Sequence, residues 1–276
     1  SSLDVLRRIC ERRGLRPPEG PREHGAPLYT YQVTPPEFAD LRREVAEEMG
    51  QGVGMYGASA GAFCLYAAEQ ICRNYAGGPW TWQLVFEALR VQAKPGEPAA
   101  WVRAGMAYWR RPIVQTASSD RLLGSLVCEG GLPLRLLADG RERYLKTFFR
   151  DIIHDAERLR LPSGQVVGRH LEALPQTLRN GTVEELGTLL ADAVIALRRQ
   201  LPAKLDNDPL QTLDRVDPRW RESVPLRVDE TALAELLRGL LREPRPAGLG
   251  DAWLEVATVL AGASFRVERR ATMPAR

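Results

Sequence analysis

The sequence predicts a mainly all-α protein, a multi-helix orthogonal array with one or two minor β-strands near the termini. Three observations predict this class. Hydrophobic residues make up 44% of the chain and charged residues 26%, the balance of a packed globular protein. Capping signals begin several segments, and Gly and Pro clusters separate them. Apolar residues also recur at helical spacing, most regularly in the stripe Leu233, Leu236, Leu237, Leu240 and Leu241.

Residues 1–53 are expected to form an N-terminal helix, a short strand and a capped helix. The first helix is predicted over Leu3–Arg13. Leu28–Val33 alternates in the manner of a strand. From Thr34 to Glu37 a threonine cap faces a glutamate three residues on, with proline at the first helical position, so a helix should run from there to about Met49.

Residues 54–160 are predicted to form a helical core that contains the most basic part of the chain. Its longest helix, Gly140–Leu159, repeats Tyr144, Leu145, Phe148, Phe149, Ile152 and Ile153 on one face. Gly and Pro breaks separate the other predicted helices, which cover Tyr56–Tyr75, Trp80–Gln92, Ala99–Arg110 and Arg121–Cys128.

Residues 161–245 are predicted to form a second helical subdomain. A capping box at Thr182–Glu185 should begin one helix, and Asp229 should cap the helix of the leucine stripe. Between these helices, Pro202–Pro225 is expected to be a connector with room for one helical turn.

Residues 246–276 are expected to be a linker and a strand-like tail. A helix is predicted over Asp251–Leu260 and a strand over Ser264–Thr272. A lone strand needs a partner for its backbone, so this one should pair with Leu28–Val33 or with a region after residue 276. The second pairing is favoured, and it would make the chain the front section of a longer protein.

The Cys and His content argues against a metal site, a disulfide framework and a bound cofactor. Cys10, Cys64, Cys72 and Cys128 have no zinc-ligand spacing and are expected to be buried free thiols. The three histidines share no motif. The chain has no apolar stretch of membrane-spanning length and no signal-peptide block at its start, so a cytoplasmic location is expected.

One segment, Gly57-Ala58-Ser59-Ala60-Gly61, fits the G-x-S-x-G pattern of serine hydrolases. That chemistry needs a strand that enters a tight turn, and the glycine-rich residues before Gly57 do not predict one. The same residues also fit the start of a helix of small residues that packs closely against a neighbouring helix. This is the favoured interpretation.

The strongest functional signal is a local excess of positive charge. Residues 90–150 hold eleven basic and five acidic residues, in a chain with a formal net charge of +3. Basic side chains can bind phosphates, and tryptophans that lie among them can stack on bases. The competing interpretations are a solvated helix face and the arginine-rich codon usage of a GC-rich genome. The candidate nucleic-acid-binding residues are Arg103, Arg110, Arg111, Arg143, Lys146 and Arg150.

Two runs of the sequence carry a family resemblance. One extends from Arg110 to Leu137 and includes Glu129-Gly130-Gly131-Leu132-Pro133. The other is Asp217-Pro218-Arg219-Trp220, leading into Val224-Pro225-Leu226. Residues 100–245 thereby resemble a segment of large bacterial proteins encoded in mobile or anti-phage defence islands. The resemblance implies association with other defence proteins, and it brings no active site.

Together these observations predict a non-catalytic helical interaction module of a bacterial defence or mobile-element system that binds a partner protein. The first alternative is a nucleic-acid-binding module that uses the Arg90–Arg150 region. The second is a serine hydrolase that uses Ser59.

Overall fold

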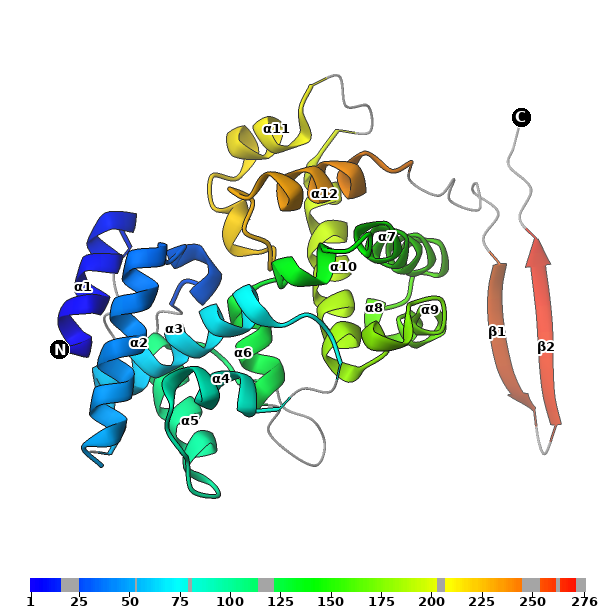
Figure 1. Ribbon diagram of the computed structural model, residues 1–276. Helices are drawn as coiled ribbons and strands as arrows, with labels where there is room; N and C mark the ends of the chain where they lie inside the picture. Colours follow the sequence, from blue (N-terminus) through cyan, green and yellow to red (C-terminus); the bar gives the residue numbers. More distant parts are fainter. Residues whose placement is uncertain are drawn as a thin grey trace.

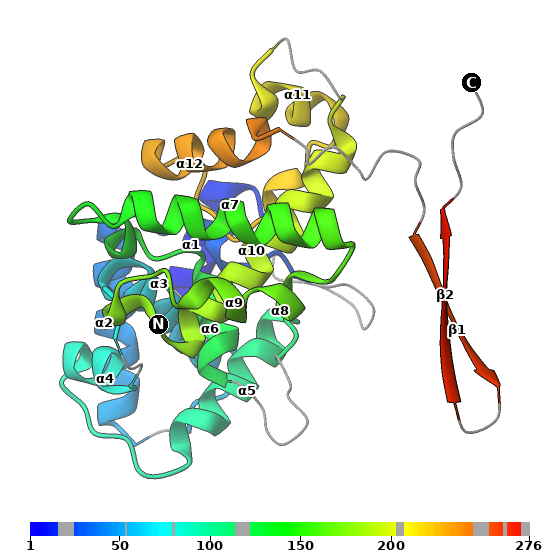
Figure 2. The same ribbon diagram turned by 90° about the vertical axis from the view of Figure 1, so that its right-hand side faces the viewer.

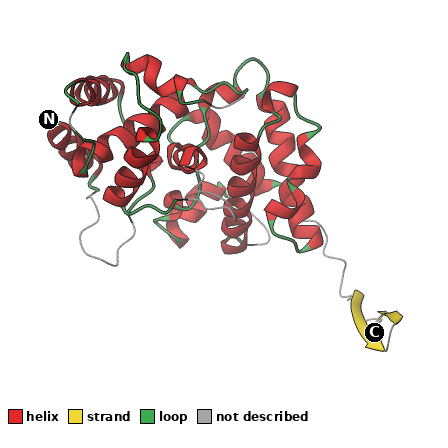
Figure 3. Cartoon of the chain, turned by 90° about the horizontal axis from the view of Figure 1, so that it is seen from below, coloured by secondary structure: helices red, strands yellow, loops and turns green. Residues whose placement is uncertain are grey.

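A computed structural model describes the chain except residues 16–24, 53, 79–80, 114–121, 203–206, 245–253, 262–263 and 272–276. The described part is mainly all-α, as predicted (Figure 1). Seen from below, its strands occur only in a C-terminal hairpin (Figure 3). No helix in the described residues is long and apolar enough to span a membrane.

The first half of the chain packs around one buried helix, α3. Every residue of α3 from Ala60 to Cys72 is buried, and its small side chains let neighbouring helices approach closely. Those neighbours contact it on several sides. The helices of this half are α1 (Ser2–Arg13), α2 (Pro35–Gly50), α3 (Gly57–Asn74), α4 (Gln83–Leu89), α5 (Glu97–Trp109) and α6 (Leu122–Gly130).

The second half packs mainly around α10, which contacts α7, α8, α11 and α12 and also reaches α6. The apolar stripe of α7 is buried as predicted from Leu145 to Ile153, but Tyr144, which was expected on the same buried face, is 38% exposed. The helices of this half are α7 (Glu142–Leu159), α8 (Ser163–Val166), α9 (Gly168–Leu171), α10 (Gly181–Gln200), α11 (Pro209–Val216) and α12 (Thr231–Arg242). Short 3-10 helices connect them at Leu134–Leu137, Gln176–Leu178 and Trp220–Glu222.

The predicted strand at Leu28–Val33 is wrong, because Leu28–Tyr31 forms a 3-10 helix. Pro27 precedes it, and the Thr30 hydroxyl donates to the Pro27 carbonyl at 2.6 Å, which closes the turn. Leu28 and Tyr31 are both buried. The alternation in the sequence therefore reflects a tight turn buried on several sides and not a pleated strand.

The expectations for the C-terminal residues need correction too. The predicted helix Asp251–Leu260 is wrong, because β1 occupies Leu254–Ala261. β2 (Ser264–Ala271) overlaps the predicted strand and pairs antiparallel with β1, so the expected pairing with Leu28–Val33 is wrong, and the pairing with a region after residue 276 stays a prediction. β-branched and aliphatic residues at alternate positions of β1 favour this extended form over a helix.

Among the predicted helix starts, the capping box at Thr34 is confirmed. The Thr34 N–H donates to Glu37 Oε2 at 2.8 Å, and the Glu37 N–H donates to Thr34 Oγ1 at 3.4 Å. Two other predicted starts shift along the chain. Asn180 caps α10, where its side-chain oxygen accepts from the Thr182 and Val183 N–H groups at 3.1 Å each. Glu230, and not Asp229, precedes α12.

One further prediction differs from the structure. The connector Pro202–Pro225 contains the two-turn helix α11, because Pro209 begins it and the Asp208 side chain caps it. The predicted helix starts at Trp80 and Arg121 lie outside the described residues; α4 begins at Gln83 and α6 at Leu122. The predicted domain boundaries at residues 53 and 160 stay predictions.

Candidate functional site

Helix α7 borders three surface hollows. The α12 hollow, about 430 Å³, lies between α7 and the C-terminal end of α12, where Arg150, Asp151, His154 and Leu240 line it. The α9 hollow, about 310 Å³, follows the N-terminal half of α7 toward α9. The α10 hollow, about 770 Å³, lies between the C-terminal end of α7 and α10. The exposed side of α7 is therefore a ridge with concave surface around it.

The α9 hollow has an apolar floor and a polar rim. Phe148 and Leu174 are buried at its base, and Tyr144 is 38% exposed at its edge. The Arg143 guanidinium lies over the Tyr144 ring, 4.7 Å from the centroid, and its Nη2 donates to the Tyr144 hydroxyl at 2.9 Å. His170 lines the same hollow. A hollow of this kind accepts an apolar side chain while the rim offers hydrogen bonds.

His170 is held in place by a carboxylate of α7. Its Nε2 lies 3.1 Å from Asp155 Oδ2, and Arg158 Nη2 donates to Asp155 Oδ1 at 3.0 Å. Burial acts to raise the pKa of the Asp155 carboxyl, but the hydrogen bond and charge of Arg158 and the neighbouring His170 outweigh it, so the pKa is lowered. Asp155 therefore stays ionised near neutral pH and fixes one ring nitrogen of His170.

The α12 hollow combines buried apolar residues with charges that are largely paired. Ile153 and Leu240 are buried in its wall. Arg198, 3% exposed, donates from Nη2 to the Glu243 carbonyl at 2.9 Å and lies 3.4 Å from Glu157 Oε2. Arg150 Nη2 lies 2.9 Å from Asp151 Oδ1. The wall of the α12 hollow thus carries charges of both signs. Its arginines, Arg150 and Arg198, already contact groups within the protein and are not all available to a ligand.

The six predicted nucleic-acid-binding residues do not lie together. Arg103 is exposed on α5, whereas Arg143, Lys146 and Arg150 lie on α7, and α5 lies well below α7 in both views (Figures 1 and 2). Arg110 is the C-cap of α5 and only partly exposed. The basic segment is continuous in sequence but divided in space.

Arg111 is used inside the fold. Its Nε donates to Glu129 Oε1 at 2.8 Å and its Nη1 to the Gly25 carbonyl at 2.9 Å. Glu129 also accepts from the Leu28 N–H at 2.9 Å. Burial raises the pKa of Glu129, against the lowering effect of Arg111. These contacts give Arg111 a structural role inside the fold, and its nucleic-acid-binding role stays a prediction.

Ser59 lies in the first turn of α3, and its surroundings do not form a nucleophile elbow. The N-cap Tyr56 is 78% exposed and no described strand precedes it. The small residues of the motif instead meet α5: a Cβ on Gly105 would lie 2.3 Å from the Ala60 carbonyl oxygen and 2.3 Å from Cys64 Sγ. Close helix packing, the interpretation favoured from the sequence, accounts for the motif.

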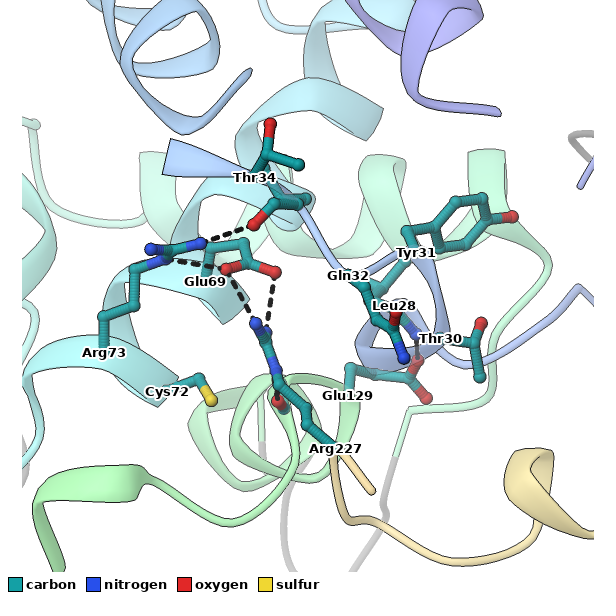
Figure 4. Close-up of polar contacts among 12 residues, drawn as sticks. Leu28, Thr30, Tyr31, Gln32, Thr34, Glu69, Cys72, Arg73, Glu129 and Arg227 are labelled. Carbon is teal, nitrogen blue, oxygen red and sulfur yellow. Dashed lines mark hydrogen bonds and ion pairs between the residues drawn. The ribbon is translucent and has the colours of Figure 1, made fainter. Parts of the chain in front are cut away.

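A buried ionic network that the sequence did not predict lies between the two halves of the chain. Glu69 on α3 lies between the guanidinium groups of Arg73 and Arg227 (Figure 4). Glu69 is 1% and Arg227 8% exposed. No sequence motif marks these residues, because the partners come from distant segments. The network contains no cluster of the kind that holds a metal, and none occurs elsewhere in the described residues.

Comparison with known proteins matches both halves to one family. The family profile described as the YjiT N-terminal domain matches residues 1–132, and the YjiT second domain matches residues 140–247. Protein YjiT of Escherichia coli (strain K12) is 31% identical over 238 residues, which cover 83% of this chain. The aligned region covers 44% of that relative, so the chain spans less than half of its length. No solved structure matches.

Proposed function

The chain belongs to the YjiT family, and from this premise we propose that it is a non-catalytic helical interaction module that binds a partner protein along the exposed ridge of α7. The observation that carries the proposal is the set of hollows beside this one helix. Concave sites with apolar floors and a few polar groups are where proteins receive ligands and partner side chains.

The composition of the ridge favours a protein over a nucleic acid. The cations Arg143, Lys146 and Arg150 lie in the N-terminal half of α7, and the carboxylates Asp151, Asp155 and Glu157 lie in its C-terminal half, so the ridge is mixed in charge along its length. Phe148 and Ile153 give the hollows apolar surface that a phosphate backbone does not use. Mixed charge around apolar pockets is instead typical of protein interfaces.

The cellular setting is part of the same proposal. The resemblance of residues 100–245 to proteins of bacterial defence or mobile-element islands supports a partner from such a system. The family profiles describe the first two domains of a longer type of protein, and a module of that kind would hold a partner near domains that follow.

A nucleic-acid-binding module remains the second candidate, because Arg143, Lys146 and Arg150 share one exposed face of α7. Site-specific photo-crosslinking separates the two candidates. A benzoylphenylalanine at the exposed position Thr147 tests the ridge in cells, and the same residue at exposed Glu47 on α2 is the matched control.

A protein adduct that forms from position 147 and not from position 47 is the expected result. A nucleic-acid adduct at 147 would favour the second candidate. Equal cross-linking at both positions, or none at 147, would overturn the proposal that the ridge of α7 is the interface.

A further inference from the structure

We infer that the partner docks on α7 with an acidic amphipathic helix, which places one apolar side chain in the α9 hollow and a second, two turns along, in the α12 hollow. This inference rests on the proposed function and names the chemistry of the partner. It follows from the arrangement of the two hollows and from the charges on the ridge between them.

The two hollows adjoin across the ridge of α7. Asp151 lines both. One opens toward α9 and the other toward α12, and these helices lie on opposite sides of α7, α12 above it and α9 below it in both views (Figures 1 and 2). A helix with its side chains is about 10–12 Å wide, so apolar groups that straddle the ridge must be about that far apart. At 1.5 Å per residue, positions i and i+7 of a helix are separated by roughly this distance.

Both hollows offer buried apolar surface to such side chains. In the α9 hollow it comes from Phe148 and Leu174, and in the α12 hollow from Ile153 and Leu240. These residues already pack into the core, so a partner side chain would extend the core without rearranging it. Rigid apolar pockets of this kind bind the anchor residues of a helix-in-groove complex.

The positive charge of residues 142–150 on the ridge favours acidic residues in the partner helix. Residues 142–150 contain three cations and one carboxylate. Within the described residues, Arg143 and Lys146 have no carboxylate partner, and Arg150 pairs with its neighbour Asp151. Glutamates at i+3 and i+4 of the partner helix would face these cations.

The position of these cations in α7 is a second, independent observation. Arg143 lies in the first turn of the helix, where the macrodipole favours anions and disfavours cations, and Lys146 and Arg150 lie beyond that turn. These cations therefore do not contribute to the stability of α7 through its dipole. An anionic ligand would stabilise these exposed cations, and the apolar hollows beside them favour an acidic peptide as that ligand.

The test uses fluorescence anisotropy with stapled helical peptides and the whole chain. The probe carries leucines at i and i+7 and glutamates at i+3 and i+4. Its two matched controls replace the glutamates with lysines or the leucines with alanines. A 20-base-pair DNA duplex is titrated in parallel at low and near-physiological salt.

Protein variants test each part of the surface. Arg143→Glu/Lys146→Glu reverses the ridge charge, and Arg7→Glu/Arg42→Glu reverses two exposed arginines of α1 and α2 as the matched control. Ala173→Trp and His154→Trp fill the α9 and α12 hollows from positions at their rims. Circular dichroism checks that every variant folds.

We expect the ridge reversal to weaken binding of the acidic peptide about tenfold or more, while the control reversal leaves it unchanged. Each tryptophan should weaken it several-fold, as should the alanine control peptide. Equal binding of the lysine peptide, or insensitivity to both tryptophans, would overturn the inference. So would salt-sensitive duplex binding abolished by the ridge reversal, because it would assign the ridge to phosphates.

Failure of this inference is distinguishable from failure of the proposed function. If position 147 cross-links to a protein but the acidic peptide does not bind, the interface stands and the acidic helix is wrong. If position 147 yields no protein adduct and no peptide binds, both are wrong.

Discussion

Arg227 and Glu69, 158 positions apart in the sequence, form a buried bidentate ion pair. Arg227 Nη1 donates to Glu69 Oε2 at 3.0 Å, and Nη2 donates to Oε1 at 2.6 Å. Arg73 completes the network from the same helix as Glu69, with its Nε 2.9 Å from Glu69 Oε2. Since Glu69 lies in the first family domain and Arg227 in the second, the pair joins the two domains at a buried point.

Removal of one partner should therefore be costly. Arg227→Met leaves the Glu69 carboxylate buried with only Arg73 beside it, and we expect the free energy of unfolding to fall by about 3–5 kcal/mol. Urea denaturation monitored by circular dichroism measures it. Arg8→Ala, which breaks an ion pair with Asp40 whose arginine is 60% exposed, is the control and should change the free energy of unfolding little.

The double variant Glu69→Met/Arg227→Met separates charge from packing. It removes both buried charges, so it should be less destabilised than Arg227→Met alone. A cost for Arg227→Met no larger than that of Arg8→Ala would show that the pair does not hold the two domains together.

The helices could be predicted where apolar residues recur at helical spacing, as in α7 and α12, because a helix that buries one face needs apolar residues at those positions. The capping box at Thr34 was equally readable, since all its parts lie within four residues. Leu28–Tyr31 was misread because burial on several sides of a short turn imitates strand alternation.

The surface around α7 could be predicted only in part. Arg143, Lys146 and Arg150 were identified because their spacing puts them on one face of one helix. The hollows beside them were not, because α9 and α12 supply their other walls from up to about a hundred residues away along the chain. The structural role of Arg111 was not predicted for the same reason, because its partner Glu129 lies 18 residues further along the chain.

The close contact of α3 with α5 gives a prediction about Gly105. A Cβ at this position would lie 2.3 Å from the backbone oxygen of Ala60, so the helices must separate to admit it. Gly105→Ala should lower the free energy of unfolding by about 1–3 kcal/mol. Gly239→Ala in α12 is the matched control, because its nearest neighbour is the flexible end of Lys146 at 3.3 Å. That change should be neutral or stabilise by roughly 0.5–1 kcal/mol. Equal melting temperatures for the two variants would contradict the close contact between α3 and α5 at Gly105.

Two truncations test the buried faces of α7 and α12. Phe148 is 3% exposed and Leu237 is fully buried. Phe148→Ala and Leu237→Ala should each destabilise the fold by about 2–5 kcal/mol in thermal or urea unfolding, through lost burial and the cavity that remains. Val216→Ala, at a position 55% exposed, should change stability little. Wild-type unfolding of either core variant would show that the helix faces are wrongly assigned.

The thiols should be protected in the folded protein. Cys10, Cys64 and Cys72 are buried, Cys128 is partly exposed, and all four are free. Burial raises the pKa of Cys10 and of Cys72 to about 11, so little thiolate is present near neutral pH. A chromogenic disulfide reagent at pH 8 should react slowly with native protein and should titrate all four thiols after denaturation. Rapid reaction of two or more thiols in the native state would refute this burial.

Asp214 gives a prediction with a defined pH dependence. A hydrogen bond from Arg221 lowers the pKa of its carboxyl, with a smaller contribution from Trp220, whose Nε1 donates to Asp214 Oδ1 at 2.8 Å. A carboxyl whose folded-state pKa is lowered adds stability above its unfolded pKa of about 4, and that stability is lost as pH falls through the folded-state pKa.

Asp214→Asn keeps an acceptor for Trp220 but removes the charge beside Arg221. Because the Arg221 and Asp214 side chains are 42% and 41% exposed, the cost at pH 7 should be under about 1 kcal/mol. The difference in the free energy of unfolding between Asp214→Asn and wild type should shrink as pH falls below the unfolded pKa.

Asp214→Leu also leaves the fully buried Trp220 without this acceptor, which should cost a further amount of about 1–3 kcal/mol at every pH. Urea unfolding at several pH values measures both effects, and identical curves for the two variants at pH 7 would show that Trp220 does not depend on Asp214.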